Sequence, residues 1–244
     1  RLYKDILSDY LENALSTGVT KNGLERALLN INDLPGISAV STIEPGVEEG
    51  SSKIILNVVE DDLVSGSITL DNHGNRYTAK QRSTVKIDIN NPSKIGDKLS
   101  ITKTFNTGQK FDFSQFDYEV PLGQSGLKAF ASASRLEFEI GKELKTNPVS
   151  LGNADTYEVG VKYPIQRTNN QSVFLKTSIE KKEIYNETTG VLTNDKILEN
   201  AKIGLDFEGK NTFQDNSLTG FSVSGIFGDL DLSKVNSDYL NDQK

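Results

Sequence analysis

Apolar residues near the start of the chain recur at the spacing of amphipathic helices. In residues 6–15 they lie three and four positions apart on one helical face, and Gly18 is placed to end this helix. A second stripe with the same spacing consists of Leu24, Ala27, Leu28 and Ile31. Thr20 is placed to cap this second helix, and Pro35-Gly36 to end it. The pattern predicts two short helices.

Two short strands are expected after these helices. The segments Ile37–Ile43 and Lys53–Glu60 are rich in β-branched and aliphatic residues, and the stretch between them contains turn-forming Pro and Gly. The order helix, helix, strand, strand is that of a small α+β unit. We expect its first strand to precede Arg1, as in a chain that is part of a longer protein.

From Leu63 onward the apolar positions alternate with polar ones, as in strands with two different faces. In Val85–Asn90 every second residue is Val or Ile, and the residues between them are Lys, Asp and Asn. The alternation recurs in Leu99–Phe105, Phe116–Val120, Leu136–Ile140, Tyr157–Ile165, Val173–Ile179, Ala201–Phe207 and Phe221–Phe227. We predict about nine strands, with long polar loops at Lys142–Asp155 and Tyr185–Asp195.

Alternation by itself suits a soluble antiparallel sheet as well as a membrane barrel, because both have one apolar and one polar face. Two features favour the barrel. Several strands are long enough to span a bilayer, and charged residues occupy the polar positions almost throughout, as a water-filled lumen favours. On this interpretation Glu137 and Glu139 face the lumen, which is simpler than a paired-carboxylate catalytic site.

Composition narrows the chemistry. The 244 residues contain no Cys, which excludes disulfides, thiol nucleophiles and most zinc sites. The net charge is −7, and lysines are mixed with acids, which argues against nucleic-acid binding. No apolar run approaches the ~20 residues of a membrane-spanning helix. We predict no enzymatic activity, no cofactor and no metal site.

Ordered motifs along residues 5–230 resemble two-partner secretion transporters (TpsB proteins). Leu24–Ile37 is similar to the second helix of the family's last POTRA domain and the turn after it. Ser65–Thr78 is similar to the first barrel hairpin, and Asn90–Ser100 to the next connection between strands. The signature residues, which we interpret as structural, are Leu24, Glu25, Arg26, Asn32, Asp33, Leu34, Pro35, Gly36, Asp71, Asn72, Gly74, Asn91, Pro92, Gly96, Asp97, Tyr118, Pro121 and Gly123.

The resemblance implies a mainly β fold. Residues 1–61 would form a second POTRA domain, incomplete at its N-terminus, and residues 62–244 the N-terminal part of an antiparallel transmembrane β-barrel. The protein would lie in the bacterial outer membrane, in contact with its lipid, with the POTRA domain in the periplasm. Its partner would be a secreted exoprotein (an adhesin, haemolysin or contact-dependent toxin) that is captured unfolded and conducted outward without ATP. We expect that this chain alone does not close a barrel, because unpaired strand edges are unfavourable in lipid.

Two alternatives stay open beside this interpretation: a related POTRA-barrel factor that inserts outer-membrane proteins, and a soluble β-rich adhesin domain. The exposed edge of the strands Ile37–Ile43 and Lys53–Glu60 is the candidate surface for binding an extended partner.

Individual residues suggest structural roles. We expect Gly74 to supply the positive φ of a tight hairpin after Asp71-Asn72, and Pro121 to lie near a strand end. His73 is expected to be a turn residue. Asp61-Asp62 is expected to be a solvated linker, and Asp229 and Asp231 lack the loop of a calcium site.

Overall fold

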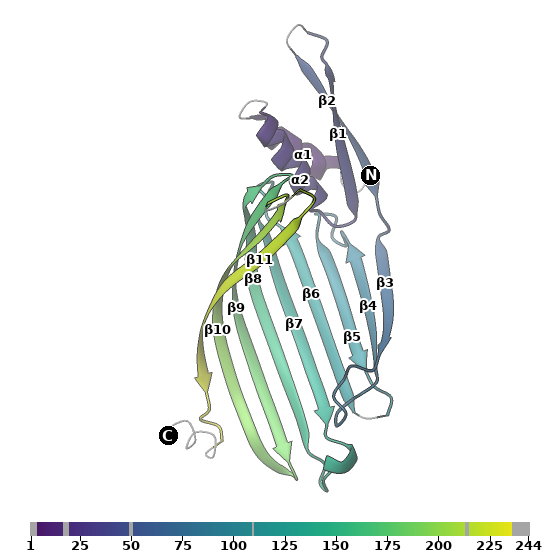
Figure 1. The fold of residues 1–244 in the computed structure, drawn as a ribbon, viewed down its shortest axis with the longest axis vertical. Coiled ribbons are helices and arrows are strands. Elements are labelled where there is room, and N and C mark those ends of the chain that lie inside the picture. Colours follow the sequence, from purple (N-terminus) through teal and green to yellow (C-terminus); the bar gives the residue numbers. More distant parts are fainter. Residues whose placement is uncertain (1–3, 17–19, 49–50, 109, 213–214, 236–244) are drawn as a thin grey trace.

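The computed structural model describes residues 4–16, 20–48, 51–108, 110–212 and 215–235. Two helices and a two-stranded hairpin lie at one end of a long, curled sheet (Figure 1). The helices are α1 (Lys4–Ser16) and α2 (Lys21–Asn32), and the hairpin consists of β1 (Ile37–Pro45) and β2 (Ser52–Glu60). The two predicted helices and the two strands after them are confirmed.

A small apolar core joins these four elements. Its buried members are Leu7, Tyr10, Ile31, Leu34, Ile37 and Ala39. The hydroxyl of Thr20 accepts a hydrogen bond from the Gly23 N–H at 3.1 Å, which confirms the predicted cap of α2. The Asn32 side chain bonds both the N–H and the carbonyl of Ala39, at 2.7 and 2.9 Å, and so joins the end of α2 to β1. Gly18, the predicted end of α1, lies outside the described residues.

The remaining strands form one antiparallel sheet of nine strands in sequence order, β3 to β11. They are β3 (Val64–Asp71), β4 (Arg82–Asn90), β5 (Lys98–Phe105), β6 (Phe111–Pro121), β7 (Lys128–Glu139), β8 (Leu151–Arg167), β9 (Gln171–Thr188), β10 (Val191–Lys210) and β11 (Leu218–Asp231). Each strand pairs with the next along the chain, so all connections are hairpins. The predicted fold class, mainly β and antiparallel with about nine barrel strands, is confirmed.

The predicted long loop at Tyr185–Asp195 was wrong. Strands β9 and β10 continue through this segment and are joined by Thr189-Gly190 alone, both at positive φ. Backbone pairing satisfies the N–H and carbonyl groups here, so the strands persist although their side chains no longer alternate. The other predicted loop, Lys142–Asp155, is shorter than expected, since it holds a 3₁₀ helix (η1, Lys142–Leu144) and β8 begins at Leu151.

The prediction for Gly74 was also wrong. The connection from β3 to β4 spans residues 72–81 and is not a tight hairpin, and Gly74 does not adopt a positive φ. Its N–H donates to the Lys80 carbonyl at 3.1 Å. A Cβ at this position would lie 1.8 Å from the Ala79 carbonyl oxygen. Glycine is required here because two backbone segments approach closely.

The two faces of the sheet differ in exposure as well as in chemistry. On the apolar face Ile179 is 64% exposed, whereas the side chain of its neighbour Glu180, on the polar face, is 13% exposed. Side chains on the inside of a curled sheet shield one another, so the polar face is the concave one (Figure 1). Glu137 pairs with Asp112 and shares the convex face with Phe116. The prediction that Glu137 and Glu139 face the lumen was therefore wrong, because the parity of the pattern changes within β7.

Candidate functional site at the junction of helices and sheet

The C-terminal end of α2 contacts the turns at the end of the sheet where β3 begins. Asp33, the residue that caps α2, forms a two-pronged ion pair with Arg167 at the end of β8. Arg167 Nη2 lies 2.7 Å from Asp33 Oδ1, and Nε lies 3.0 Å from Oδ2. The Arg167 side chain is only 16% exposed and also donates to the Ser172 hydroxyl at 2.7 Å. Paired, partly buried charges of this geometry define the position of one element on another.

A second cation binds the same end of the helix. Lys128 Nζ, at the start of β7, donates to the Asp33 carbonyl oxygen and to Glu119 Oε1, each at 2.8 Å. The carbonyl groups at a helix C-terminus carry partial negative charge and have no partner within the helix. Lys128 therefore satisfies a free carbonyl of α2 while it remains paired with Glu119 on the neighbouring strand β6.

Two residues of the first turns of α2 contact the end of β8 and the turn that follows it. Arg26 Nη2 donates to the Pro164 carbonyl oxygen at 2.9 Å, and its guanidinium lies 6.0 Å from the centre of the Tyr163 ring. The Glu25 carboxylate accepts the Asn169 N–H at 2.6 Å. Glu25, Arg26 and Asp33 therefore share one structural role, because all three join α2 to the sheet.

The connection between β4 and β5 contains a buried carboxylate. Asp97 is 0% exposed and accepts hydrogen bonds from the Ser93 N–H, at 3.1 and 3.2 Å, and from the Tyr118 hydroxyl at 2.8 Å. The Asn91 N–H donates to the Asp97 carbonyl at 2.6 Å, and the Gly96 N–H to Asn91 Oδ1 at 2.7 Å. Burial raises the pKa of Asp97, but the hydrogen bonds outweigh it and hold the pKa below its usual value.

The turn that contains Asp97 packs against the C-terminal end of α2. Gly96 has φ +83, and a Cβ there would lie 3.1 Å from Leu34 Cδ2 and 3.3 Å from Pro121 Cγ. Leu34, at the end of α2, therefore packs directly on the turn. Nearby, the Tyr10 hydroxyl donates to the Gly123 carbonyl at 3.2 Å. Burial, together with the negative charge of Asp33, raises the pKa of Tyr10 to about 12.

Most signature residues named from the sequence come together at this junction, but one group does not. Asp71, Asn72 and Gly74 lie at the opposite end of the sheet, where Asp71 pairs with Arg82 at 3.1 Å. The His73 N–H donates to Asp71 Oδ1 at 2.9 Å. Pro92 is exposed on the turn that Asp97 organises.

Several residues of the junction were missed in the sequence, namely Tyr10, Lys128 and Arg167. Arg167 follows a predicted strand and Lys128 lies between two of them, and neither carries a local signal of its contact with Asp33, which is far away in sequence. Tyr10 lies within the predicted first helix, but the helical spacing of residues 6–15 carries no signal of its bond to Gly123.

The concave face of the sheet carries a network of charges around Glu158 and Glu180. Lys202 Nζ lies 2.6 Å from Glu180 and 3.8 Å from Glu158. The Ser178 hydroxyl donates to Glu158 at 2.7 Å, and the Asn200 amide to Glu180 at 3.0 Å. This face is suited to line a water-filled interior. Within the described residues no cluster of three or more His, Asp or Glu side chains is arranged to hold a metal ion.

In the described part of the chain, neither helix is long and apolar enough to cross a membrane. Among curated proteins, the chain is similar to heme/hemopexin transporter protein HuxB of Haemophilus influenzae. It is 25% identical over 213 residues to the protein of strain 86-028NP, covering 87% of this chain and 37% of the relative. For the protein of strain ATCC 51907 (KW20, Rd) the identity is 25% over 224 residues, with 92% and 39% covered. The chain thus spans less than two fifths of these relatives.

Two solved structures share the fold. CdiB from Escherichia coli aligns with a TM-score of 0.75 and 18% identity, over 91% of this chain and 42% of that chain. CdiB from Acinetobacter baumannii aligns with a TM-score of 0.71 and 17% identity, over 87% and 41%. The family model of haemolysin secretion/activation proteins ShlB/FhaC/HecB matches residues 50–221, which is most of the chain. The chain therefore belongs to the ShlB/FhaC/HecB family, the two-partner secretion transporters of the bacterial outer membrane.

Proposed function

We propose that the whole protein recognises an unfolded partner exoprotein in the periplasm and conducts it through its barrel to the cell surface without ATP. The observation that carries this proposal is the two-faced sheet. Its convex face is apolar over much of its length, as lipid contact requires, and its concave face carries the Glu158–Glu180–Lys202 network. A polar interior wall allows an extended polypeptide to pass without binding tightly.

Residues 1–61 are proposed to act as a POTRA domain and residues 62–244 as the N-terminal part of the barrel. Support comes from the separate apolar core of the helical unit and from its polar junction with the sheet. Through Asp33 and Arg167 the domain has a defined position beside the barrel opening, where it could pass an extended partner to the lumen.

The hairpin β1–β2 is the proposed surface for partner recognition. It extends beyond the two helices (Figure 1), and Val40 and Val59 are exposed on its outer face. An extended partner could add a strand to this sheet through backbone hydrogen bonds, with apolar side chains at alternate positions providing selectivity. We propose an adhesin, haemolysin or contact-dependent toxin as the partner, lipid as the surrounding medium, and no catalytic activity.

Secretion of the partner tests the proposal. Cells would express the full-length protein together with a candidate partner exoprotein, and the partner would be measured in the medium. Val40→Lys combined with Val59→Lys should reduce the secreted partner several-fold, because both changes place charge on the outer face of the hairpin. Asp9→Lys, at an exposed position of α1 outside the hairpin, is the control. Partner secretion that does not depend on this protein at all would contradict the proposal.

A further inference from the structure

The convex face of the sheet changes character partway along its strands. Toward the helix end this face carries exposed apolar side chains: Phe116, Tyr157, Val159, Ile179, Ile203 and Phe227. On β8 the apolar positions run from Tyr157 to Ile165, which is roughly 26 Å of strand. At a usual tilt of about 40° this corresponds to roughly 20 Å of bilayer, close to the apolar band of outer-membrane barrels. The band is therefore nearly sufficient to cross the hydrocarbon layer.

Beyond this band the same face carries charges. Arg135, Asp155 and Glu183 are register neighbours on β7, β8 and β9. Arg135 is 58% exposed and lies 2.8 Å from Glu137 and 3.7 Å from Asp155. Lys181, which pairs in register with Tyr157 at the edge of the band, is 46% exposed and lies 2.8 Å from Glu183. Exposed Arg and Lys side chains on the lipid face of a barrel are unfavourable in hydrocarbon and become tolerable only near the interface.

At the same level the concave face becomes apolar. Phe113, Leu136, Ala154 and Ile184 form one row of register partners across β6 to β9. One residue pair further out, a Cβ on Gly152 would lie 2.6 Å from the ring of Phe138, so this ring lies directly over the glycine. The apolar and charged sides of the strands therefore exchange places at the level of Arg135 and Asp155. A sheet with this pattern has its apolar side turned away from its surroundings, as in a water-exposed protein.

We propose that the outer boundary of the hydrocarbon layer runs between Tyr157 and Asp155, and that the strand ends beyond it form an extramembrane collar. The collar consists of β6 to β10 beyond this line, with charged residues facing the headgroup layer and water, and apolar residues facing inward. The strands β6 to β10 would thus extend beyond the hydrocarbon layer, unlike the strands of a barrel that lie within it along their full length. The proposal depends on the outer-membrane location and not on the identity of the secreted partner.

Cysteine labelling tests the boundary directly, because the chain has no native Cys. Ile197→Cys and Ile203→Cys are matched, since both residues are isoleucines on the convex face of β10 and pair with β9 and β11. Ile197 lies in the register row of Asp155, beyond the proposed boundary, and Ile203 lies within the apolar band. In intact cells expressing the full-length protein, a membrane-impermeant maleimide should label Ile197→Cys at least about tenfold faster than Ile203→Cys, which lipid shields. When the protein is unfolded, both cysteines are accessible to the maleimide, and the labelling rates of the two variants should become similar.

Equal protection of both positions would overturn the proposal, since lipid would then cover the charged level too. Rapid labelling of Ile203→Cys in intact cells would also overturn it. Glu183→Cys, in the register row of Asp155, and Leu175→Cys provide a second matched pair on the convex face of β9 if a β10 variant fails to reach the membrane. Immunoblots of outer-membrane fractions check that each variant is inserted.

Discussion

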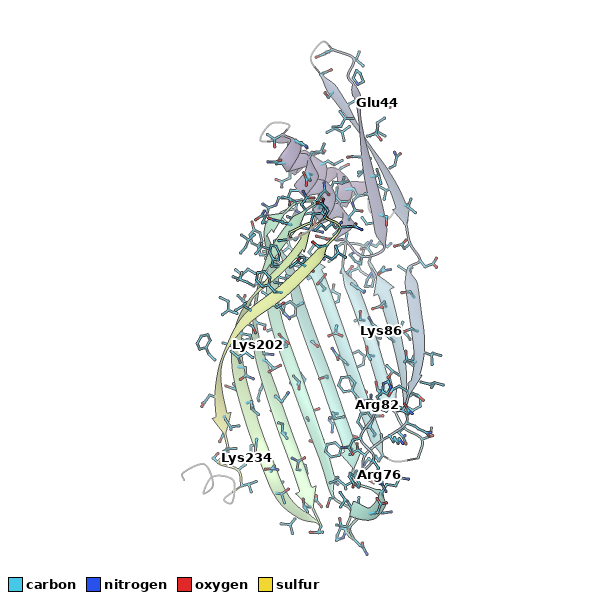
Figure 2. The ribbon with its side chains drawn as sticks, viewed as in Figure 1. Glu44, Arg76, Arg82, Lys86, Lys202 and Lys234 are labelled. Carbon is cyan, nitrogen blue, oxygen red and sulfur yellow. The ribbon has the colours of Figure 1, made fainter. Side chains whose placement is uncertain are left out.

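At the helix end of the sheet, charged side chains are partly buried and bond to turns and to a helix terminus; at the opposite end, charged side chains meet in the open. Arg167 and Asp33 represent the first arrangement, with two short bonds and little exposure. Arg76 and Glu143 represent the second, and both side chains are 62% exposed. Figure 2 labels Arg76 and Lys234 at this far end. Exposed ion pairs contribute little to stability, whereas breaking a partly buried pair leaves a charge without a partner.

This difference shows where the molecule needs a defined geometry. The far end is a set of hairpins, and its ion pair between Arg76 and Glu143 is exposed. The helix end must position one folded unit against another, and for this it uses named partners at several turns. Substitutions should therefore have effects that decrease from the buried turn at the helix end to the exposed far end.

The largest effect is expected for Asp97→Ala. The change leaves the Tyr118 hydroxyl and the Ser93 N–H without their acceptor in a buried turn. We expect a loss of about 3 kcal/mol in the free energy of unfolding of the full-length protein in detergent, measured by urea denaturation. Asp61→Ala, at an exposed position, is the control. A loss no larger than that of the control would show that the turn does not depend on this carboxylate.

The contribution of Asp97 should depend on pH in the acidic range. Because its folded pKa is lowered, the stabilisation is present above the ordinary carboxyl pKa of about 3.9 and is lost as pH falls through the lowered value. The difference in unfolding free energy between the wild type and Asp97→Asn should therefore be constant from about pH 7 to 5 and shrink below about pH 4. A difference that grows on acidification would contradict the sign of the shift.

The pairing of Asp33 with Arg167 should be measurable as a coupling. In a double-mutant cycle of Asp33→Ala and Arg167→Ala, we expect an interaction energy of about 1–2 kcal/mol, because both side chains are partly buried and form two bonds. Limited proteolysis should also cut the segment between α2 and β3 faster in each variant. Additive effects of the two changes would mean that each residue acts through other contacts.

A smaller effect is expected for Tyr10→Phe. The change removes one hydrogen bond to the Gly123 carbonyl but keeps the buried ring. The loss should be about 1 kcal/mol in unfolding free energy. Alkaline spectrophotometric titration of the wild type should also show one phenol, absent in this variant, that ionises near pH 12. Below the ordinary tyrosine pKa the stabilisation is complete, and it is lost as pH rises through about 12.

The smallest effect is expected for Arg76→Ala at the far end. Its ion pair with Glu143 is exposed, so solvent already screens it. The thermal midpoint should change by less than about 1 °C, with Arg76→Lys as the matched variant. A shift as large as that of Arg167→Ala would remove the proposed difference between the two ends of the sheet.

The pattern of apolar and polar residues was sufficient to predict the helices and strands, but not the residues at which they end. The helical spacing around Leu24 and Ile31 and the alternation in Val85–Asn90 report local backbone geometry, which depends on neighbours in sequence. Strand ends such as Tyr185–Asp195 lose the alternation because neither of their faces meets lipid, so the pattern that reveals a strand disappears while the pairing continues. Gly74 similarly indicated a turn, but the sequence did not show that this turn is a long connection in which two backbone segments approach closely.

Periodicity and ordered motifs were sufficient to establish the fold class, the order of helices and strands, and the family. The contacts of Asp33 with Arg167 and Lys128, and the exchange of the two faces of β7 near Arg135, emerge only in three dimensions. The physical reason is the separation along the sequence between the residues that interact. Periodicity describes residues a few positions apart, whereas the junction and the change of face depend on the register between strands and on contacts between distant segments.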